Sequence, residues 1–482
     1  MTTRVLPVRN PRTGEHDYTI SCASSEDIRA IIAPMRKAQK AWLARGLEHR
    51  AEILEVFRDR LLSHKEALAN VLAKDTGRHK ISEIEVGGVT KAVDRWIETA
   101  RSCATEETGT SRELPGVRYR VVHDPYPLVG AISPWNFPLT LTMIDAIPAL
   151  LAGCAVCIKP SEITPRFAEP LRAAIEETKE LNTVLSIVDG NGETGASLVA
   201  QVDAICFTGS ARTGLKVAQR AAARLIPAFL ELGGNDPALV LEDADVERAA
   251  TALVRASVVN TGQACQSIER IYVARTILKD FLARLVAKAE AVEINYPDMK
   301  SGHIGPLIFS EQAKIIERQF EDAKAKGATF HCGGQIETHG GGAWCRPTVI
   351  TDVNDSMSVM TEETFGPVMP VVPFDTEEEA VLMANDTDYG LSAAVFSSDP
   401  ARAEAIAIKL EAGAISINDA SLTSLIHEAE KTSYKLSGLG GSRMGKSGYT
   451  RFLRKKALIT NEGDPYSIEA MNEALYLTPA EA

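Results

Sequence analysis

AVCIKP at residues 155–160, LSIVDG at 185–190 and AICFTG at 204–209 are short apolar runs that alternate with helical stretches. The stretch RFAEPLRAAIEETKEL follows the first run, and TGLKVAQRAAARL follows the third. Strand and helix repeat at intervals of about 25 residues, an order that implies parallel strands joined by right-handed crossovers. These residues therefore predict a doubly wound α/β sheet.

The same texture returns between residues 268 and 420, where the apolar runs are IERIYVA, MPVVPF, AAVFSS and GAISIN. A chain of 482 residues has room for about two to four domains. We therefore predict two doubly wound α/β domains, the first made of residues 1–114 and 130–232 and the second of residues 233–420. A separate small β element with a C-terminal tail is expected at residues 115–129 and 435–482.

Two local patterns refine this organisation. Residues 25–75 have apolar positions at helical spacing, a serine cap in SSEDIRAII and a glycine stop at Gly77, so helices are expected there. Residues 117–132, VRYRVVHDPYPLVGAI, alternate as strands do and carry the turn signal Asp124-Pro125. A long hairpin is expected over them.

Composition and charge exclude several classes of protein. Acidic residues outnumber basic ones, 64 to 52, for a net charge of -12, so nothing favours a nucleic-acid partner. The longest apolar stretch, Ile147–Ile158, is broken by Pro148 and Gly153 and is too short to span a membrane. No signal peptide is visible at the N-terminus, and most of the eight cysteines lie in apolar runs, so we expect reduced thiols and a cytoplasmic protein.

Cys265 has a setting unlike that of the other cysteines. It follows Asn260-Thr261-Gly262-Gln263-Ala264, a small polar run in which the backbone can approach a ligand closely. A thiolate stabilised by backbone N–H groups is a strong nucleophile. The segment alone also leaves open a buried, unreactive cysteine.

Two further side chains fit a nucleophilic site. Glu231 lies between two leucines and before Gly233-Gly234, where it could act as a general base, although a surface glutamate at a strand end is the plainer interpretation. Asn136 lies in Pro-Trp-Asn-Phe-Pro, whose prolines and aromatic rings can hold an amide donor in fixed geometry, as an oxyanion hole requires. A turn-forming asparagine is the alternative.

The ends of two predicted strands indicate a nucleotide site. FTGSARTG, residues 207–214, ends a strand and opens a helix whose N-terminus, at Gly209 and Ser210, can hold a phosphate. Lys159 and Glu162 follow the strand at 155–159, where a nucleotide ribose lies in such sheets. A glutamate there accepts from a ribose hydroxyl and repels a 2′-phosphate, which favours NAD over NADP.

Two other motifs do not fit their usual chemistry. GGSRMGKS, residues 440–447, matches the P-loop pattern, but the preceding KTSYKLSGL is a poor buried strand and few residues follow. Cys154-x-x-Cys157 lies inside an apolar strand and has no second pair at metal-site spacing. Packing is therefore expected for these two cysteines, and no metal.

Five segments, in this order and spacing, resemble the aldehyde dehydrogenase superfamily of NAD(P)-dependent, hydrolytic enzymes. They are SPWNFPLT (133–140), FTGSARTG (207–214), LELGGNDP (230–237), NTGQACQS (260–267) and EETFGPV (362–368). By this resemblance Cys265 is the catalytic nucleophile, Glu231 the general base and Asn136 the oxyanion donor. The resemblance also implies cofactor contacts at Ile132, Ser133, Pro134, Trp135, Lys159, Ser161, Glu162, Gly192, Phe207, Thr208, Gly209, Ser210, Leu232, Glu363 and Phe365.

The resemblance also implies a fold and a reaction. The first predicted domain would be a Rossmann-like NAD-binding domain, the second the catalytic domain, and the small β element an oligomerisation element, so a homodimer or homotetramer is expected. The nucleophile attacks a small-molecule aldehyde, NAD takes the hydride, and water activated by Glu231 releases the acid from a thioester on Cys265. The presence of Glu231 argues for water as the acyl acceptor, and no metal is implied.

The sequence departs from the family pattern at several places. Asn235 stands where the family often has a lysine after L-E-L-G-G. Ala264 precedes the nucleophile in place of the usual cysteine or valine. Residues 430–435, Glu-Lys-Thr-Ser-Tyr-Lys, replace the common P-F-G-G-x-K stretch in the loop 419–436, which borders the substrate entrance.

One departure suggests a new pair of charges. In many members of the superfamily a lysine nine residues past the oxyanion asparagine pairs with a C-terminal glutamate. Here the nearby residue is Asp145, and the C-terminal region offers Arg443. We therefore expect a charge-swapped Asp145–Arg443 pair.

The substrate is the part that the sequence determines least. No arginine lies beside Cys265 before Arg270, so no carboxylate clamp is evident and an apolar aliphatic or aromatic aldehyde is expected. A semialdehyde dehydrogenase of the same family and a non-catalytic structural relative are the alternatives. The residues expected near the substrate tunnel, unless they only pack the core, are Leu141, Ile144, Leu422 and Leu425.

Overall fold

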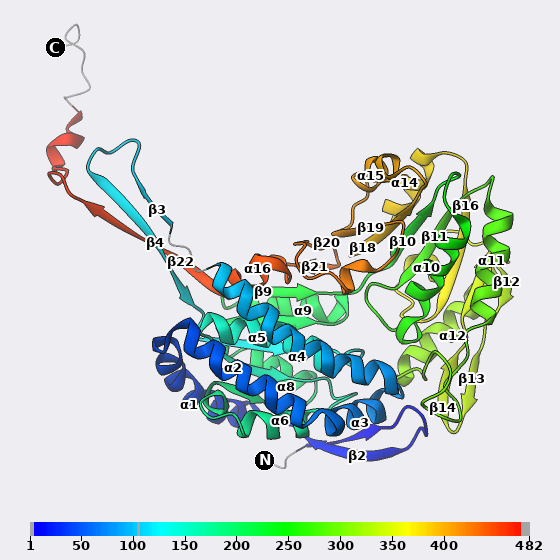
Figure 1. The fold of residues 1–482 in the computed structure, drawn as a ribbon, viewed down its shortest axis with the longest axis horizontal. Helices are drawn as coiled ribbons and strands as arrows, with labels where there is room; N and C mark the ends of the chain where they lie inside the picture. Colours follow the sequence, from blue (N-terminus) through cyan, green and yellow to red (C-terminus); the bar gives the residue numbers. More distant parts are fainter. Residues whose placement is uncertain (1–3, 104–106, 474–482) are drawn as a thin grey trace, which may run out of the picture.

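The computed structural model describes residues 4–103 and 107–473 of the chain. It contains two large sheets with helices packed around them and a narrow three-stranded sheet that projects away from the first (Figure 1). This arrangement confirms the predicted α/β fold with two doubly wound units. Residues 474–482, the end of the predicted C-terminal tail, lie outside the described residues.

The first sheet is built from β5 (Leu128–Ile132), β6 (Ala155–Lys159), β7 (Leu185–Ile187), β8 (Ala204–Thr208), β9 (Ala228–Glu231) and β21 (Gly438–Leu439). Its strand order is β21-β9-β8-β5-β6-β7, and β5 to β9 run parallel. Both β6 and β8 are buried along their whole length, as expected for parallel strands covered on both faces. The order reverses between β5 and β8, and such a switch point is where ligands bind in open α/β sheets.

Two helices of this unit begin or end at residues that are typical helix caps. Ser24 caps the first one, because its side chain accepts from the Asp27 N–H while the Asp27 carboxylate accepts from the Ser24 N–H. Gly77 ends the third helix at a φ of 70°, as predicted from the sequence. The helices are α1 (Ser25–Ala44), α2 (Gly46–Ser63), α3 (Lys65–Thr76), α4 (His79–Ser102), α5 (Pro138–Ala152), α6 (Ala168–Glu176), α7 (Leu181–Val184), α8 (Gly192–Val199) and α9 (Ala211–Ala222).

The second sheet is built from β10 (Asp236–Val240), β11 (Ile268–Ala274), β12 (Thr329–Cys332), β15 (Thr348–Thr351), β16 (Val368–Phe374), β18 (Ser392–Phe396) and β19 (Ala414–Ile417). Its order is β12-β15-β16-β11-β10-β18-β19, with only the β12–β15 pair antiparallel. The central strand β11 is buried at every residue. Its helices are α10 (Val246–Val258), α11 (Leu278–Glu290), α12 (Ser310–Ala325), α13 (Ser358–Thr361), α14 (Glu377–Asn385) and α15 (Pro400–Ala407).

Shorter elements complete the described chain. A hairpin at the N-terminus pairs β1 with β2, and a second hairpin pairs β13 with β14. Their bounds, with those of the remaining elements, are β1 (Val5–Arg9), β2 (His16–Ser21), η1 (Val259–Gly262), β13 (Ile336–His339), β14 (Gly342–Cys345), β17 (Tyr389–Gly390), η2 (Leu422–Ser424), β20 (Tyr434–Lys435), α16 (Gly445–Thr450) and η3 (Ile468–Met471). None of the helices described is long and apolar enough to cross a membrane.

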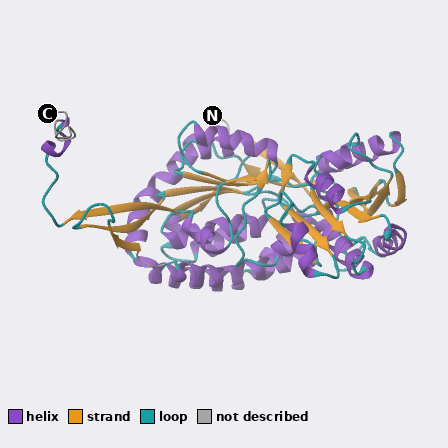
Figure 2. Ribbon diagram, turned by 90° about the horizontal axis from the view of Figure 1, so that it is seen from above, coloured by secondary structure: helices purple, strands orange, loops and turns teal. Residues whose placement is uncertain are grey.

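The projecting arm consists of β3 (Glu107–Thr110), β4 (Val117–Pro125) and β22 (Leu453–Asn461), in the order β22-β4-β3 (Figure 2). The predicted hairpin over residues 117–132 is therefore wrong: β4 pairs with β3 and β22, whereas β5 enters the parallel sheet between β6 and β8. Alternation identifies a strand but not its partner, and β22 comes from the opposite end of the chain. β3 also lies in the arm, although the predicted first domain extends to residue 114.

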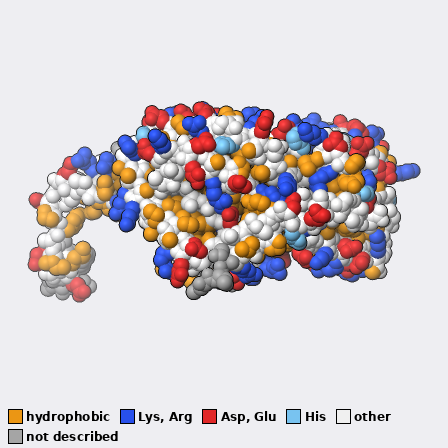
Figure 3. All heavy atoms as spheres, turned by 90° about the horizontal axis from the view of Figure 1, so that it is seen from below, with side chains coloured by type: hydrophobic (Ala, Val, Ile, Leu, Met, Phe, Trp, Pro, Cys, Tyr) orange, Lys and Arg blue, Asp and Glu red, His pale blue; other side chains and the backbone are white. Residues whose placement is uncertain are grey.

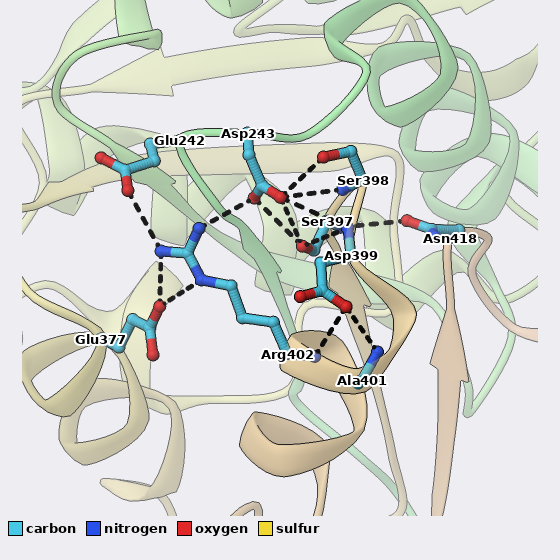
Figure 4. A network of polar contacts seen from close by, with 9 residues as sticks. All are labelled: Glu242, Asp243, Glu377, Ser397, Ser398, Asp399, Ala401, Arg402 and Asn418. Atoms are coloured by element: carbon cyan, nitrogen blue, oxygen red, sulfur yellow. Dashed lines mark hydrogen bonds and ion pairs between the residues drawn. The ribbon is translucent and has the colours of Figure 1, made fainter.

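Asp243 organises a polar network at one end of the second sheet (Figure 4). Its carboxylate accepts from Ser397 Oγ at 2.8 Å and from the Ser398 N–H at 3.1 Å, and it pairs with Arg402 at 3.2 Å. The Arg402 Nε also donates to Glu377 at 2.6 Å. These contacts join the loop after β10 to the end of β18 and to α14 and α15.

Asp243→Ala is expected to lower the free energy of unfolding by about 1–2 kcal/mol, because several donors lose their acceptor. Partial burial opposes ionisation, but hydrogen bonds from Ser398 and Ser397 hold the pKa of Asp243 below its usual 3.8. The stabilisation is thus present above about pH 4 and lost as the pH falls through the lowered pKa. Urea unfolding of both proteins at pH 7 and pH 3 measures this, and an equal difference at the two pH values would contradict it.

Candidate active site

A cavity of about 700 Å³ lies at the carboxyl ends of β5, β6 and β8, at the switch point of the first sheet. The structure brings together in its wall Cys265, Asn136, Leu141 and every residue predicted to contact the cofactor. These last are Ile132, Ser133, Pro134, Trp135, Lys159, Ser161, Glu162, Gly192, Phe207, Thr208, Gly209, Ser210, Leu232, Glu363 and Phe365.

Glu231 and three of the predicted substrate residues are not part of this wall. Glu231 is the last residue of β9. Ile144 lies on α5 and Leu422 begins η2, both half-buried, whereas Leu425 is 66% exposed. The structure therefore groups only Leu141 with Cys265, and contact of the other three with substrate stays a prediction.

Cys265 follows a strained turn at the end of α10. Asn260 and Thr261 have φ values of 57° and 59°, a left-handed backbone that the surrounding structure must hold in place. The Asn260 side chain donates to the carbonyl of Gln263 at 2.8 Å and to that of Asn136 at 3.0 Å. The turn is therefore tied to the segment that carries Asn136.

Asn136 is held at both its side chain and its backbone. Its Nδ2 donates to the Gln263 carbonyl at 3.0 Å, and its own carbonyl accepts from Arg78 Nη2 at 2.9 Å. Arg78 in turn lies 3.6 Å from Glu85, and burial raises the pKa of Glu85 to about 7. Arg78 and Glu85 were not predicted from the sequence, because no motif around them marks their contact with the Asn136 segment.

Lys431 is a third charged residue near the site that was not predicted from the sequence. Its Nζ lies 3.6 Å from Glu231 Oε2, and its side chain is buried. Burial raises the pKa of Cys265 to about 12, and the charge of Lys431 opposes that rise. The replacement of the P-F-G-G-x-K stretch indicated that this loop departs from the family pattern. The sequence does not show, however, where a side chain of the loop points.

Glu363 and Phe365 line the cavity from the loop after α13. The Glu363 carboxylate accepts from the Gly234 N–H at 3.1 Å, and burial raises its pKa to about 7. A Cβ on Gly233 would overlap this carboxylate, so a larger residue there would displace the Glu363 side chain. The Phe365 ring lies edge-on to Trp135 with centroids 5.3 Å apart.

The opposite end of the cavity has groups suited to a dinucleotide. Lys159 Nζ lies 2.9 Å from Glu162 Oε2, so a cation and a carboxylate are available to ribose hydroxyls. Ser210 caps α9, whose N-terminus offers backbone N–H groups and a positive dipole end to a pyrophosphate. A Cβ on Gly209 would lie 2.6 Å from the Phe207 ring, so a larger residue at this position would force the ring to move.

Comparison with known proteins identifies the family to which this chain belongs. The chain matches the model described as "Aldehyde dehydrogenase family" over residues 1–458. It belongs to the aldehyde dehydrogenase family. "Putative succinate-semialdehyde dehydrogenase" from Mycolicibacterium smegmatis, which has NADP(+) in its name, is 35% identical over 464 residues, 94% of this chain and 88% of that protein.

Further relatives of this aldehyde dehydrogenase agree. "Betaine aldehyde dehydrogenase" from Cereibacter sphaeroides is 35% identical over 460 residues, 95% of this chain and 94% of that protein. The solved structure of "Putative Aldehyde Dehydrogenase PutA from Anabaena variabilis" has a TM-score of 0.94 and 51% identity, and the match covers 96% of this chain and 99% of that one. The family uses NAD(P) and oxidises aldehydes.

This aldehyde dehydrogenase contains the charge-swapped pair expected from its sequence. Arg443 Nη2 lies 2.8 Å from Asp145 Oδ2, with both side chains buried. Arg451 pairs with the other oxygen of the same carboxylate, a contact that the sequence did not predict. Arg443 also donates to Thr208 Oγ1 at 2.6 Å, which connects the pair to the cavity wall.

The P-loop-like run at 440–447 and the pair Cys154 and Cys157 lack the surroundings that their usual chemistry requires. The run at 440–447 is preceded by the two-residue strands β20 and β21 and contains the start of the short helix α16, so the buried strand that a P-loop requires is missing from the described residues here. Cys154 and Cys157 are fully buried, and all eight cysteines are free. Across residues 4–103 and 107–473, no group of three or more His, Cys, Asp or Glu is placed to hold a metal ion.

Proposed function

We propose that this protein oxidises an aldehyde to the carboxylic acid, with NAD as hydride acceptor, through a thiohemiacetal and a thioester on Cys265. The observation that carries the proposal is that one cavity is lined by Cys265 and Asn136 and also by the residues proposed to bind the cofactor. The Cys265 thiolate attacks the aldehyde carbonyl, and N–H groups of the Asn136 amide and the Cys265 backbone donate to the oxyanion. NAD, when bound, takes up the hydride.

Release of the acid is assigned to Glu231. Its carboxylate lies at the end of β9 next to Lys431 and outside the cavity wall. From there it can accept a proton from a water molecule that attacks the thioester carbonyl. The products are the free Cys265 thiol and the carboxylic acid, so the chain's own residues account for the second half of the reaction.

Glu231→Gln is expected to keep the first hydride transfer and to lower steady turnover about 10²–10³-fold, because an amide cannot take the proton from water. Rapid mixing with aldehyde and NAD should show a burst of NADH close to one per active site, followed by a slow phase. Glu98→Gln, which removes an exposed carboxylate on α4, is the matched control. A steady rate equal to that of the unaltered protein would remove the base assignment.

NAD is proposed over NADP on the basis of Glu162. Its carboxylate, paired with Lys159, would repel a 2′-phosphate. Three cations of α9 also line the cavity, namely Arg212, Lys216 and Arg220, and they could attract that phosphate once the carboxylate is gone.

Glu162→Ser is therefore expected to raise the ratio of kcat/KM for NADP to that for NAD about tenfold, which is equivalent to about 1.4 kcal/mol. Initial rates with each cofactor at fixed aldehyde measure the ratio. Glu169→Ser, which removes an exposed carboxylate on α6, should leave the ratio unchanged. The same ratio in Glu162→Ser as in the unaltered protein would show that this carboxylate does not select the cofactor.

The proposed substrate is an apolar aliphatic or aromatic aldehyde. Leu141 lines the cavity with Cys265, whereas Arg270 is buried and donates to the carbonyls of Asn235 at 3.0 Å and Ala384 at 2.9 Å, so it is not available to a substrate carboxylate. A semialdehyde is the second candidate, because one relative is named for succinate semialdehyde. Values of kcat/KM over apolar, aromatic and carboxylated aldehydes decide between them, and no NADH from any aldehyde would indicate a non-catalytic relative.

We also infer a homodimer or homotetramer. The arm presents apolar side chains along its strands (Figure 3), among them Tyr119 at 39%, Leu458 at 39% and Ile459 at 71% exposure. Exposed apolar side chains beside an unpaired strand edge, here that of β22 among the described residues, are typical of surfaces that another chain covers. Light scattering on the intact protein measures its mass, and a monomer at micromolar concentration would contradict the inference.

A further inference from the structure

The loop after η2 places a buried cation beside Glu231. The Lys431 side chain is 6% exposed, and its Nζ has no hydrogen-bond partner among the described residues. Burying an ammonium group without a hydrogen bond costs free energy unless a charge of opposite sign compensates it. The carboxylate within ion-pair distance is that of Glu231, whose Oε2 lies 3.6 Å from Nζ.

A strand pairing and a backbone-to-side-chain hydrogen bond hold the segment that carries Lys431. Strand β21 pairs antiparallel with β9, so that Gly438 lies opposite Glu231. At the other end of the loop, the Lys431 N–H donates to Ser442 Oγ at 3.1 Å. The strand that carries Glu231 therefore also anchors the loop that carries Lys431.

The surroundings of Cys265 are otherwise acidic. Burial is the largest cause that raises the pKa of its thiol, and the charges of Asp236, Glu363 and Glu231 raise it further. These groups come from β10, from the loop after α13 and from β9 respectively. Lys431 is the cation that lowers the pKa of Cys265. Without it, a thiolate at Cys265 would face these three carboxyl groups without the opposing charge of Lys431.

We propose that Lys431 is a positioning residue that holds the Glu231 carboxylate and offsets the acidic groups around Cys265, so that the thiol can lose its proton. The proton leaves Sγ for water, and the Lys431 ammonium stays protonated throughout. The proposal rests on the proposed function, in which Cys265 and Glu231 act on the same substrate.

The test is the pH dependence of alkylation of Cys265 by iodoacetamide, followed in the full-length protein by mass spectrometry of the peptide that contains it. K431M is expected to shift the midpoint upward by about one pH unit or more, because a nearby opposite charge is lost. K431Q is a second neutral variant, and K431R should restore most of the midpoint. K435M is the matched control, because Lys435 lies in the same loop but donates to the carbonyls of Asn385 at 2.6 Å and Thr387 at 3.0 Å.

The proposal would be overturned if the alkylation midpoint of Cys265 were the same in three proteins. These are the unaltered protein, K435M and a neutral Lys431 variant that still binds NAD. An unshifted midpoint together with a KM increase for carboxylated aldehydes alone would also overturn it, and would make Lys431 a substrate clamp. Alkylation needs no aldehyde. If the unaltered protein oxidises none while the neutral variants shift the midpoint, the proposed function fails and the effect of Lys431 on the thiol stands.

Discussion

Cys265→Ala is expected to lower the rate of NADH formation about 10⁴-fold or more, because alanine cannot form the covalent intermediate on which the proposed reaction depends. Asn136 and the cofactor residues stay in place, since the turn that positions this segment is held by the side chain and backbone of Asn260 and Gln263. The variant should therefore bind NAD as the unaltered protein does. Absorbance of NADH at saturating aldehyde and calorimetric titration with NAD measure the two properties separately.

Cys22→Ala is the control for loss of a thiol, because Cys22 is also a partly exposed free cysteine but is not among the residues that line the cavity. It should retain full activity. Activity in Cys265→Ala within tenfold of the unaltered protein would mean that another group attacks the aldehyde. Loss of NAD binding together with activity would point instead to a structural role for Cys265.

The parts of the fold that the sequence predicted correctly are those set by local patterns. The apolar runs at 155–160 and 204–209 became buried parallel strands, because such strands are covered on both faces and lack polar positions. Ser24 begins one helix and Gly77 ends another, each through contacts within a few residues of the chain. The hairpin over 117–132 failed because strand pairing depends on residues far along the chain, here β22.

The candidate site shows the same division. The family resemblance carried by the motif around Phe207 and the run before Cys265 predicted that these segments belong to one site, and both line the same cavity. The sheet-edge argument covers Lys159 and Glu162, because ligands bind at the carboxyl ends of parallel strands. Arg78 and Lys431 were not predicted, since each reaches the site from a distant segment and neither stands in a motif of nucleophilic chemistry. The buried charges that compensate one another at this site could therefore be identified only from the structure.

Asp145→Ala is expected to lower the free energy of unfolding by about 3–5 kcal/mol, because it leaves buried cations without their carboxylate. Asp145 is shared by Arg443 and Arg451, and all three side chains are buried. Arg443→Met removes only one of the two cations, so it should cost less than loss of the shared carboxylate. Urea unfolding of the variants and of the double variant gives the complete cycle.

The cycle should show coupling of about 1–3 kcal/mol between Asp145 and Arg443, with the double variant less destabilised than the sum of the single ones. Additive effects would contradict the pair. Burial opposes ionisation, but the two guanidinium groups hold the pKa of Asp145 below its usual 3.8. A lowered folded-state pKa makes the stabilisation constant above about pH 4 and removes it as the pH falls through that lowered value. The coupling measured at pH 7 should therefore persist at pH 5, whereas a pair that depended on a titrating histidine would weaken between these two values.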